Sequence, residues 1–259
     1  MEYPDIIYGK EGHIATITLN RPERMNAFSI VMIDSIQRAL QDADADDEIR
    51  VIVVTGAGRG FCAGLDLKEP PDFRRGFAGQ GEVQAPPLPL IALSIDKPII
   101  ASINGPAIGW GLELALLCDI RIAAENARIG DRHVNYSVIA DNGGLFLLPR
   151  LVGWAKACEI SFTGQLMDGK EAERIGLVNR AVPPEQLEAI TREMGNTIAN
   201  QPPLAIQLTK RAMRDGLNSD LKTSQECAIA LFRQLVGSED FGEAMKALVE
   251  GREPHFKGP

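Results

Sequence analysis

Two stretches decide the predicted fold of this chain: FCAGLDLKE at residues 61–69 and NGPAIGWGLELA at residues 104–115. Each places glycine just before a predicted helix start, where backbone N–H groups have no partner inside the helix and the helix dipole is positive. Two such ends that face each other could stabilise the charge of a developing oxyanion. Taken alone, each stretch fits a tight glycine turn equally well.

The residues around these stretches alternate between strand and helix patterns, which predicts an α/β fold. A helix follows Ser29, which is a suitable N-cap, because the next apolar residues are spaced by three or four. A second, buried helix is predicted over Leu112–Leu117. A turn is expected at residues 9–12, and strands are expected at residues 6–8, 14–19, 51–55, 99–103 and 119–123.

After residue 182 the pattern becomes entirely helical. Leu187, Ile190, Met194 and Ile198 share one helix face, and similar stripes continue to about Val249. We therefore predict a core over residues 1–195 and a helical C-terminal region over residues 196–259. Residues 68–89 are rich in proline and glycine, and we expect them to form a mobile loop or lid.

The composition excludes several classes of protein. With 259 residues, 45% of them hydrophobic, the chain can bury a full core. Its net charge of -8 gives no broad positive field for nucleic acid or acidic lipid. No segment approaches the roughly 18 uninterrupted apolar residues of a membrane span, and Met1–Asp5 lack the basic end and apolar run of a secretory signal. We expect a cytoplasmic protein that binds neither nucleic acid nor membrane.

The cysteines and the glycine motifs indicate neither a metal centre nor a nucleotide cofactor. The four cysteines are far apart, with no C-x-x-C pair, so we expect buried free thiols at Cys62, Cys118, Cys158 and Cys227. The glycines at residues 56–60 do not complete a dinucleotide fingerprint, because Phe61 stands where the third glycine belongs. A G-K-[ST] ending and a G-x-S-x-G elbow are also missing.

Together the two glycine stretches resemble the crotonase superfamily, the enoyl-CoA hydratase/isomerase family, and the resemblance covers nearly the whole chain. Further matching motifs are LNRP at 19–22, MNA at 25–27, LCD at 117–119, GG at 143–144, TG at 163–164 and PHFK at 254–257. The resemblance implies a crotonase-like spiral of repeated ββα units. It also implies that the C-terminal helices mediate assembly into a homotrimer or a hexamer of two trimers.

The resemblance also implies binding residues. The family's two oxyanion amides fall on Leu65 and Trp110. Many members have glycine at the second position, so the indole should narrow or reshape the acyl pocket. Coenzyme A is expected as part of an acyl-CoA substrate and not as a permanently bound cofactor. Its site falls on Ala63, Gly64, Asp66, Leu67 and Lys68, with Lys68 and, more weakly, Lys257 as phosphate ligands. Lys68 fits a solvated surface charge equally well.

Hydratases of this family use two glutamates, one to activate water and one to handle the proton delivered to carbon. Glu113 matches the first and lies on the same helix face as the Trp110 amide. A carboxylate in an apolar helix needs a function or a structural ion pair, because an unpaired buried charge is unfavourable by several kcal/mol.

His133 occupies the position of the second glutamate. It could carry a proton near neutral pH, or it could be a hydrogen-bonded structural residue. Asp141 stands where some family isomerases carry an acidic residue that faces the substrate. Alternatively, it caps the helix that follows.

The resemblance implies an enzyme that acts on an acyl-CoA thioester through an enolate stabilised in an oxyanion hole. The outcome is hydration of a 2-enoyl-CoA or isomerisation of a double bond. One alternative is a carbon–carbon bond hydrolase on the same fold, in which His133 and Asp141 act on a β-dicarbonyl compound. The other is a non-catalytic acyl-CoA-binding protein, which an ion pair that fully engages Glu113 would favour.

Overall fold

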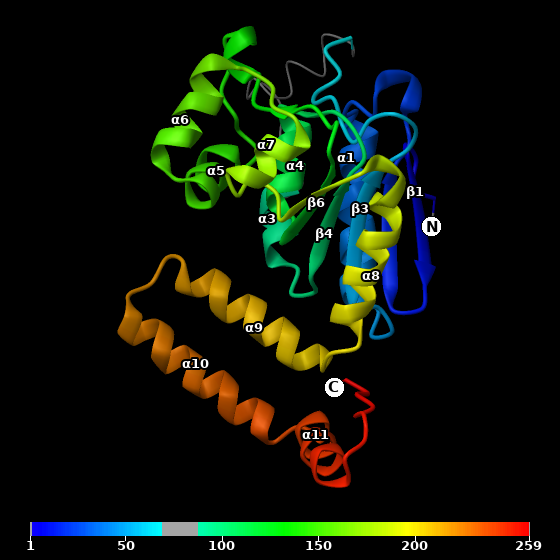
Figure 1. Ribbon diagram of the computed structural model, residues 1–259, viewed down its shortest axis with the longest axis vertical. Coiled ribbons are helices and arrows are strands. Elements are labelled where there is room, and N and C mark those ends of the chain that lie inside the picture. The colour runs from blue at the N-terminus through cyan, green and yellow to red at the C-terminus, as the bar shows by residue number, and fades with distance from the viewer. Residues whose placement is uncertain (1, 69–87, 259) are drawn as a thin grey trace.

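A six-stranded sheet forms the centre of the computed structural model, which describes residues 2–68 and 88–258 (Figure 1). The strand order is β1-β2-β3-β4-β6-β8. β1 and β2 pair antiparallel, and the other neighbours in the sheet pair parallel. The strands are β1 (Ile6–Glu11), β2 (Ile14–Leu19), β3 (Val51–Gly56), β4 (Ile99–Ile103), β6 (Ile120–Ala124) and β8 (Arg180–Val182). The predicted α/β class is confirmed.

The turn predicted at residues 9–12 is wrong in its extent. Gly9 pairs with Thr16, so β1 runs on to Glu11 and the chain turns at Gly12, whose φ of 56° suits glycine. The Lys10 ammonium lies 2.6 Å from the carboxylate of Asp42, in the helix over Ile30–Ala45, and 2.7 Å from that of Asp46, which directly follows this helix. These ion pairs help to hold the strand extended past the predicted turn.

Helices cover both faces of the sheet. In Figure 1, α8 (Leu187–Ala199) crosses the front of the strands and α1 (Ile30–Ala45) lies behind them. α1 begins as predicted, because the Ser29 hydroxyl accepts a hydrogen bond from the Met32 N–H at 3.0 Å. The predicted apolar face of α8 packs on the core. The central strands are therefore covered on both sides, which explains their continuous apolar runs.

A second group of elements lies beside one end of the sheet, at the upper left of Figure 1. It contains short helices and a two-stranded parallel sheet made by β5 and β7. The bounds are β5 (Ala107–Ile108), α4 (Trp110–Leu117), β7 (Ile129–Gly130), α5 (Gly144–Val152), α6 (Trp154–Thr163) and α7 (Gly169–Arg174). α4 packs against α5; α4 carries Trp110 and Glu113, and Asp141 lies in the segment ahead of α5.

The C-terminal helices α9 (Pro203–Gly216), α10 (Leu221–Val236) and α11 (Glu239–Glu250) extend below the sheet in Figure 1. The predicted boundary between residues 195 and 196 falls inside α8. The Lys210 ammonium connects α9 to the core, 2.7 Å from an Asp119 carboxylate oxygen.

The predicted loop and the predicted buried thiols have different outcomes. Of the loop predicted at residues 68–89, residues 69–87 lie outside the described residues, and Leu88 and Pro89 begin helix α3 (Leu88–Ser94). All four cysteines are free, but only Cys62 and Cys118 are fully buried. Among the described residues, no helix has the combination of length and apolar character that crossing a membrane requires.

Candidate active site

A small parallel ladder brings the two glycine stretches together. Cys62 forms a parallel bridge to Ala107 in β5, and β5 pairs with β7. Parallel segments that lie side by side end at the same edge. The residues that follow their carboxyl ends, Leu65, Trp110 and His133, therefore emerge in one region although they are far apart in the sequence.

Glycine allows this close approach. A side chain at Gly64, whose φ is +99°, would place its Cβ 2.8 Å from the Ile108 carbonyl oxygen and 3.7 Å from the Trp110 nitrogen. A Cβ at Gly111 would lie 2.1 Å from the Cys62 carbonyl oxygen. Real Cβ atoms do not approach other atoms so closely. The glycines singled out in the sequence are therefore required for the two segments to pack.

The backbone amides of the two segments differ in their partners. The Leu65 N–H donates no hydrogen bond within the described part of the chain, whereas the N–H groups of Ala63 and Asp66 donate to backbone carbonyls at 3.0 and 3.1 Å. Trp110 is the first residue of α4, and its N-cap, Gly109, has no side chain with which to cover this helix end. The structure thus places Trp110 close to Gly64, the residue before Leu65, and the oxyanion role of the two N–H groups stays a prediction.

Glu113 is a buried carboxylate that is engaged on one side only. Its side chain is 2% exposed, and its Oε1 accepts hydrogen bonds from the N–H groups of Asn142 and Gly144, both at 2.8 Å. Among the described residues, its Oε2 has no hydrogen-bond partner. Glu113 thus caps the start of α5. The alternative in which Asp141 caps this helix is wrong, because the Gly144 N–H donates to Glu113 and Asp141 Oδ1 accepts from the Trp110 indole N–H instead.

Burial dominates the acidity of Glu113. Desolvation raises the pKa of this carboxyl to about 7, although the Gly144 N–H and the nearby His133 both act to lower it. A carboxyl with such a pKa exchanges protons near neutral pH, which is the range in which a general base works best.

His133 lies between two carboxylates. Its Nδ1 is 2.6 Å from Asp131 Oδ1, and its Nε2 is 3.5 Å from Glu113 Oε2. Burial acts to lower the pKa of the imidazole, but the hydrogen bond to Asp131 and the charge of Glu113 together raise it. Sequence reasoning did not identify Asp131 or its partner Ser161, whose hydroxyl donates to Asp131 Oδ2 at 2.9 Å. The available signal was an acidic residue two positions before the histidine.

Asp141 completes the cluster from the segment ahead of α5. Its Oδ1 accepts a hydrogen bond from the Trp110 indole N–H at 2.8 Å, and the indole packs edge-on against Phe28 with ring centroids 6.1 Å apart. Polar atoms of Glu113, His133 and Asp141 all lie within 4.8 Å of one another. The three predicted catalytic residues therefore converge, and the large residue at position 110 orients one of them.

The same three side chains are close enough to share a metal ion. However, two backbone N–H groups already hold Glu113, and an indole N–H holds Asp141. We therefore interpret the cluster as acid–base groups and not as a metal centre.

The predicted coenzyme A residues are only partly brought together. Asp66 is 7% exposed and pairs with Arg21, N to O at 3.1 Å, while Leu67 and Lys68 are exposed beside it. Lys257 lies on the C-terminal tail, where its N–H donates to Asp240 Oδ1 of α11 at 2.9 Å. No contact within the described residues joins Lys257 to the stretch at residues 61–68, so its phosphate role stays a prediction.

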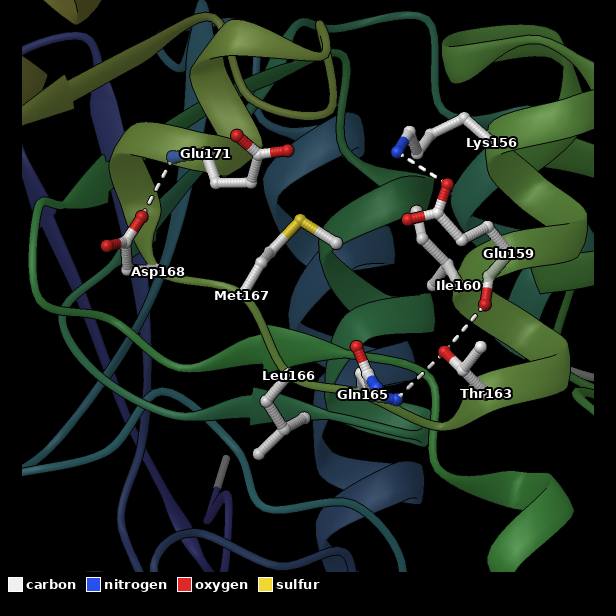
Figure 2. Close-up of a pocket in the computed structure, with 9 residues that line it drawn as sticks. All are labelled: Lys156, Glu159, Ile160, Thr163, Gln165, Leu166, Met167, Asp168 and Glu171. Atoms are coloured by element: carbon white, nitrogen blue, oxygen red, sulfur yellow. Dashed lines mark hydrogen bonds and ion pairs between the residues drawn. The ribbon is translucent and has the colours of Figure 1, made fainter.

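Two cavities of the structure lie elsewhere. Figure 2 shows one of about 290 Å³ between α6 and α7, with Lys156 and Glu159 on one side and Asp168 and Glu171 on the other. Another, of about 720 Å³, lies between α8 and the sheet. None of the predicted site residues lines either cavity.

Known proteins match this chain over almost its whole length. The family model described as Enoyl-CoA hydratase/isomerase matches residues 9–259. The short-chain-enoyl-CoA hydratase of Clostridium acetobutylicum is 36% identical, with 97% of each chain covered. The (E)-benzylidenesuccinyl-CoA hydratase of Thauera aromatica is 38% identical, covering 95% of this chain and 96% of that one.

Solved structures agree with these sequence relatives. The crystal structure of an enoyl-CoA hydratase from Bacillus anthracis superposes with a TM-score of 0.92 at 33% identity, covering 98% of this chain and all of that one. An enoyl-CoA hydratase from Geobacillus kaustophilus gives a TM-score of 0.89 at 37% identity, with 99% of each chain covered. The fold, the converging residues and these matches together place this chain in the enoyl-CoA hydratase/isomerase family, as a crotonase-type enzyme.

Proposed function

We propose that this protein adds water to the double bond of a 2-enoyl-CoA thioester. The thioester carbonyl accepts hydrogen bonds from the backbone N–H groups of Leu65 and Trp110, which stabilise the enolate oxygen. The observation that carries the proposal is the open Oε2 of buried Glu113, which lies beside His133 and one helical turn from Trp110. A carboxylate held by one oxygen only has its other oxygen available for a proton.

Each group has one step in this reaction. Glu113 Oε2 takes a proton from water, and the water oxygen bonds to C3 while the electron pair of the double bond moves to C2 and the carbonyl. C2 then takes a proton from His133 or Asp141. The sum is the addition of one water molecule, with the charge on the carbonyl oxygen formed and removed again.

The same groups can move a double bond when water is excluded. Glu113 would then take a proton from carbon, and a neighbouring acid would return one to another carbon of the same enolate. We favour hydration, because the relatives from Clostridium acetobutylicum and Thauera aromatica are both named as hydratases. A non-catalytic binder is disfavoured, because it should hold both carboxylate oxygens in structural hydrogen bonds. Within the described residues Glu113 Oε2 accepts no hydrogen bond, and its ion-pair contact at 3.5 Å is with His133, itself a proposed acid–base group.

The exposed surface of the C-terminal helices indicates a subunit contact. Large apolar side chains are exposed on α10 and α11, among them Phe232 at 64%, Leu248 at 74% and Val249 at 87%. Monomers rarely leave so many such residues uncovered. We propose that these helices assemble the chain into a homotrimer or a hexamer. The cytoplasmic location predicted from the sequence is retained as part of the proposal.

The test incubates the protein with a panel of enoyl-CoA thioesters in deuterated water enriched in ¹⁸O. Hydration places solvent oxygen at C3 and deuterium at C2, whereas isomerisation adds deuterium without oxygen. Glu113→Gln should lower kcat by about 10²–10⁴-fold, because general acid–base catalysis contributes on that order. The control is Glu226→Gln, whose carboxylate is exposed on α10, and it should leave kcat unchanged.

Other outcomes would replace this function. Tight binding of acyl-CoA without turnover, unchanged in Glu113→Gln, would identify a silent binding protein. Cleavage of a β-diketone with no activity on thioesters would identify a carbon–carbon hydrolase. Product analysis by mass spectrometry distinguishes all of these results.

A further inference from the structure

We propose that Asp131 is a positioning residue, which fixes the ring of His133 so that Nε2 is the only nitrogen that exchanges protons with the substrate and with Glu113. This inference rests on the proposed hydratase function and assigns the second acid–base group of that reaction to His133. It gives a role to a buried carboxylate that lies outside the family's pair of glutamates.

Asp131 is buried, and hydrogen bonds to both of its carboxylate oxygens fix its side chain. It is 5% exposed, and its Oδ1 accepts from both the backbone N–H of His133 at 3.0 Å and ring Nδ1 at 2.6 Å. Its Oδ2 accepts from the Ser161 hydroxyl of α6 at 2.9 Å. Both oxygens are engaged, so this carboxylate has little freedom to turn. One partner, His133, lies two residues further along the chain, and the other, Ser161, lies on α6.

These contacts fix the protonation pattern of the ring. A carboxylate only accepts hydrogen bonds, so the hydrogen on Nδ1 stays on the Asp131 side. In the neutral ring the lone pair then lies on Nε2, and in the charged ring Nε2–H faces Glu113 Oε2 at 3.5 Å. The ring also packs over Gly109, where a Cβ would lie 3.6 Å from its Cε1. His133 thus presents a single proton-exchanging atom beside the Trp110 amide.

With this arrangement, every proton that hydration moves has a donor and an acceptor. Glu113 Oε2 takes one proton from water, and His133 Nε2–H gives one proton to C2. The enzyme is then left with a protonated Glu113 and a neutral His133. Transfer of the proton from Oε2 to Nε2, whose heavy atoms are 3.5 Å apart, restores the starting state without help from a third group.

Within residues 2–68 and 88–258, the charged groups that face the ring all fit this role. Glu113 approaches from α4, Asp141 from the segment ahead of α5, and Asp131 from the end of β7. α6 contributes Ser161, which contacts the ring only through Asp131. All three carboxylates favour the charged form of His133, but only Asp131 is hydrogen-bonded to Nδ1.

The test is Asp131→Asn. The amide oxygen can still accept from Nδ1–H and from the His133 N–H, and its NH₂ can donate to Ser161, so the geometry is kept and the charge is lost. We expect kcat for the preferred enoyl-CoA to fall about 10–100-fold, as for other groups that orient a catalytic histidine. KM should change less than threefold. The alkaline limb of the kcat profile should move to lower pH.

Two matched variants separate positioning from folding. Ser161→Ala removes one hydrogen bond but keeps the carboxylate, and it should lower kcat less than fivefold. In a His133→Asn background, adding Asp131→Asn should change kcat no further, because a residue that acts through His133 has no effect without it. If Asp131→Asn does not fold, two variants of Ser161 still test the inference. Ser161→Ala removes the hydrogen bond to Asp131, and Ser161→Val removes it and adds bulk, so kcat should fall further in the second variant.

NMR titration of the ¹⁵N-labelled His133 ring needs no substrate. It should show hydrogen on Nδ1 in the neutral wild-type ring and a lower ring pKa in Asp131→Asn. An unchanged ring pKa, or equal effects of Asp131→Asn with and without His133, would overturn the inference. Failure of the hydratase function would look different, because the wild type would then hydrate no thioester whatever the ring titration shows.

Discussion

At the scale of single residues, Glu113 combines the two features that make a buried carboxyl useful. It is almost completely buried, and one of its oxygens has no hydrogen-bond partner within the described residues. Burial raises its pKa to about 7, and hydration needs the ionised form. Activity on an enoyl-CoA should therefore rise with pH through about 7, and it should fall again at higher pH where His133 loses its proton.

The measurement is kcat/KM between pH 5 and 9 in buffers of constant ionic strength. The free enzyme should show an acid limb near pH 7, well above the pKa of about 4.5 of an exposed glutamate. An acid limb near pH 4.5 would mean that another group acts as the base, because the pKa of buried Glu113 would then not control the rate.

The sequence identified Glu113, His133 and Asp141, and it did not identify Asp131. Glu113 was visible because a charge among leucines needs an explanation, and His133 and Asp141 were visible through their positions in the family motif. Asp131 lies in a run of three charged or polar residues, Asp131–His133, where an acid is unremarkable. Its role depends on a contact with α6, thirty residues away, that no local pattern encodes.

At the scale of elements, the start of α5 holds the catalytic carboxylate in place. The Gly144 N–H donates to Glu113 Oε1, and a Cβ at Gly144 would lie 2.8 Å from that oxygen and 3.0 Å from Glu113 Cγ. Gly144→Ala should displace Glu113 and lower kcat about 10–100-fold, because small misplacements of a catalytic group have effects on that order.

Gly242→Ala is the matched control. Gly242 lies within helix α11, and a Cβ there would meet nothing within 4 Å. This variant should keep full kcat and gain about 0.5–1 kcal/mol of stability, because alanine favours the helix. If both variants kept full activity in the same assay, Glu113 would not depend on the start of α5.

Elements were predictable where they are long or periodic. α1 and α8 each bury one apolar stripe, and the inner strands are continuous apolar runs. The group from α5 to α7 was not separated into helices, because α5 is short and contains Pro149. The extent of β1 was missed because Gly9 signals a turn, whereas its pairing with Thr16 depends on the partner strand.

At the scale of the whole molecule, the exposed side of α10 predicts an assembly. Ile229, Phe232 and Val236 lie on one helix face, and their side chains are 42%, 64% and 42% exposed. If this stripe forms part of the subunit contact, Phe232→Lys should convert the trimer or hexamer into smaller species. Analytical ultracentrifugation measures the change.

Ala230→Lys serves as the comparison for that variant. Ala230 is also exposed on α10, but it lies about 100° around the helix from Ile229. The lysine at position 230 should leave the mass of the assembly unchanged. A monomeric wild type would end the assembly proposal, and equal dissociation by both lysines would place the contact on a different face of α10.

The stability of the molecule should depend on pH because folding raises the pKa of two groups in the same direction. Glu113 titrates near 7 in the folded protein and near 4.5 when unfolded, so its proton stabilises the fold at low pH and this contribution is lost as pH rises through 7. The pKa of His133 is also raised on folding, and its contribution is likewise present at low pH and lost as the ring deprotonates.

Glu113→Gln should therefore be more stable than the wild type at pH 8, by up to about 3 kcal/mol, and this advantage should shrink to about 1 kcal/mol or less at pH 5. The glutamine keeps an oxygen for the N–H groups of Asn142 and Gly144, and its NH₂ can donate to neutral His133 Nε2. Urea unfolding at the two pH values measures the difference, with Glu226→Gln expected to follow the wild type. The same substitution should strongly lower kcat, so the wild-type carboxylate trades stability for activity. If Glu113→Gln were instead less stable than the wild type at pH 8, the ionised carboxylate would stabilise the fold and this interpretation would be wrong.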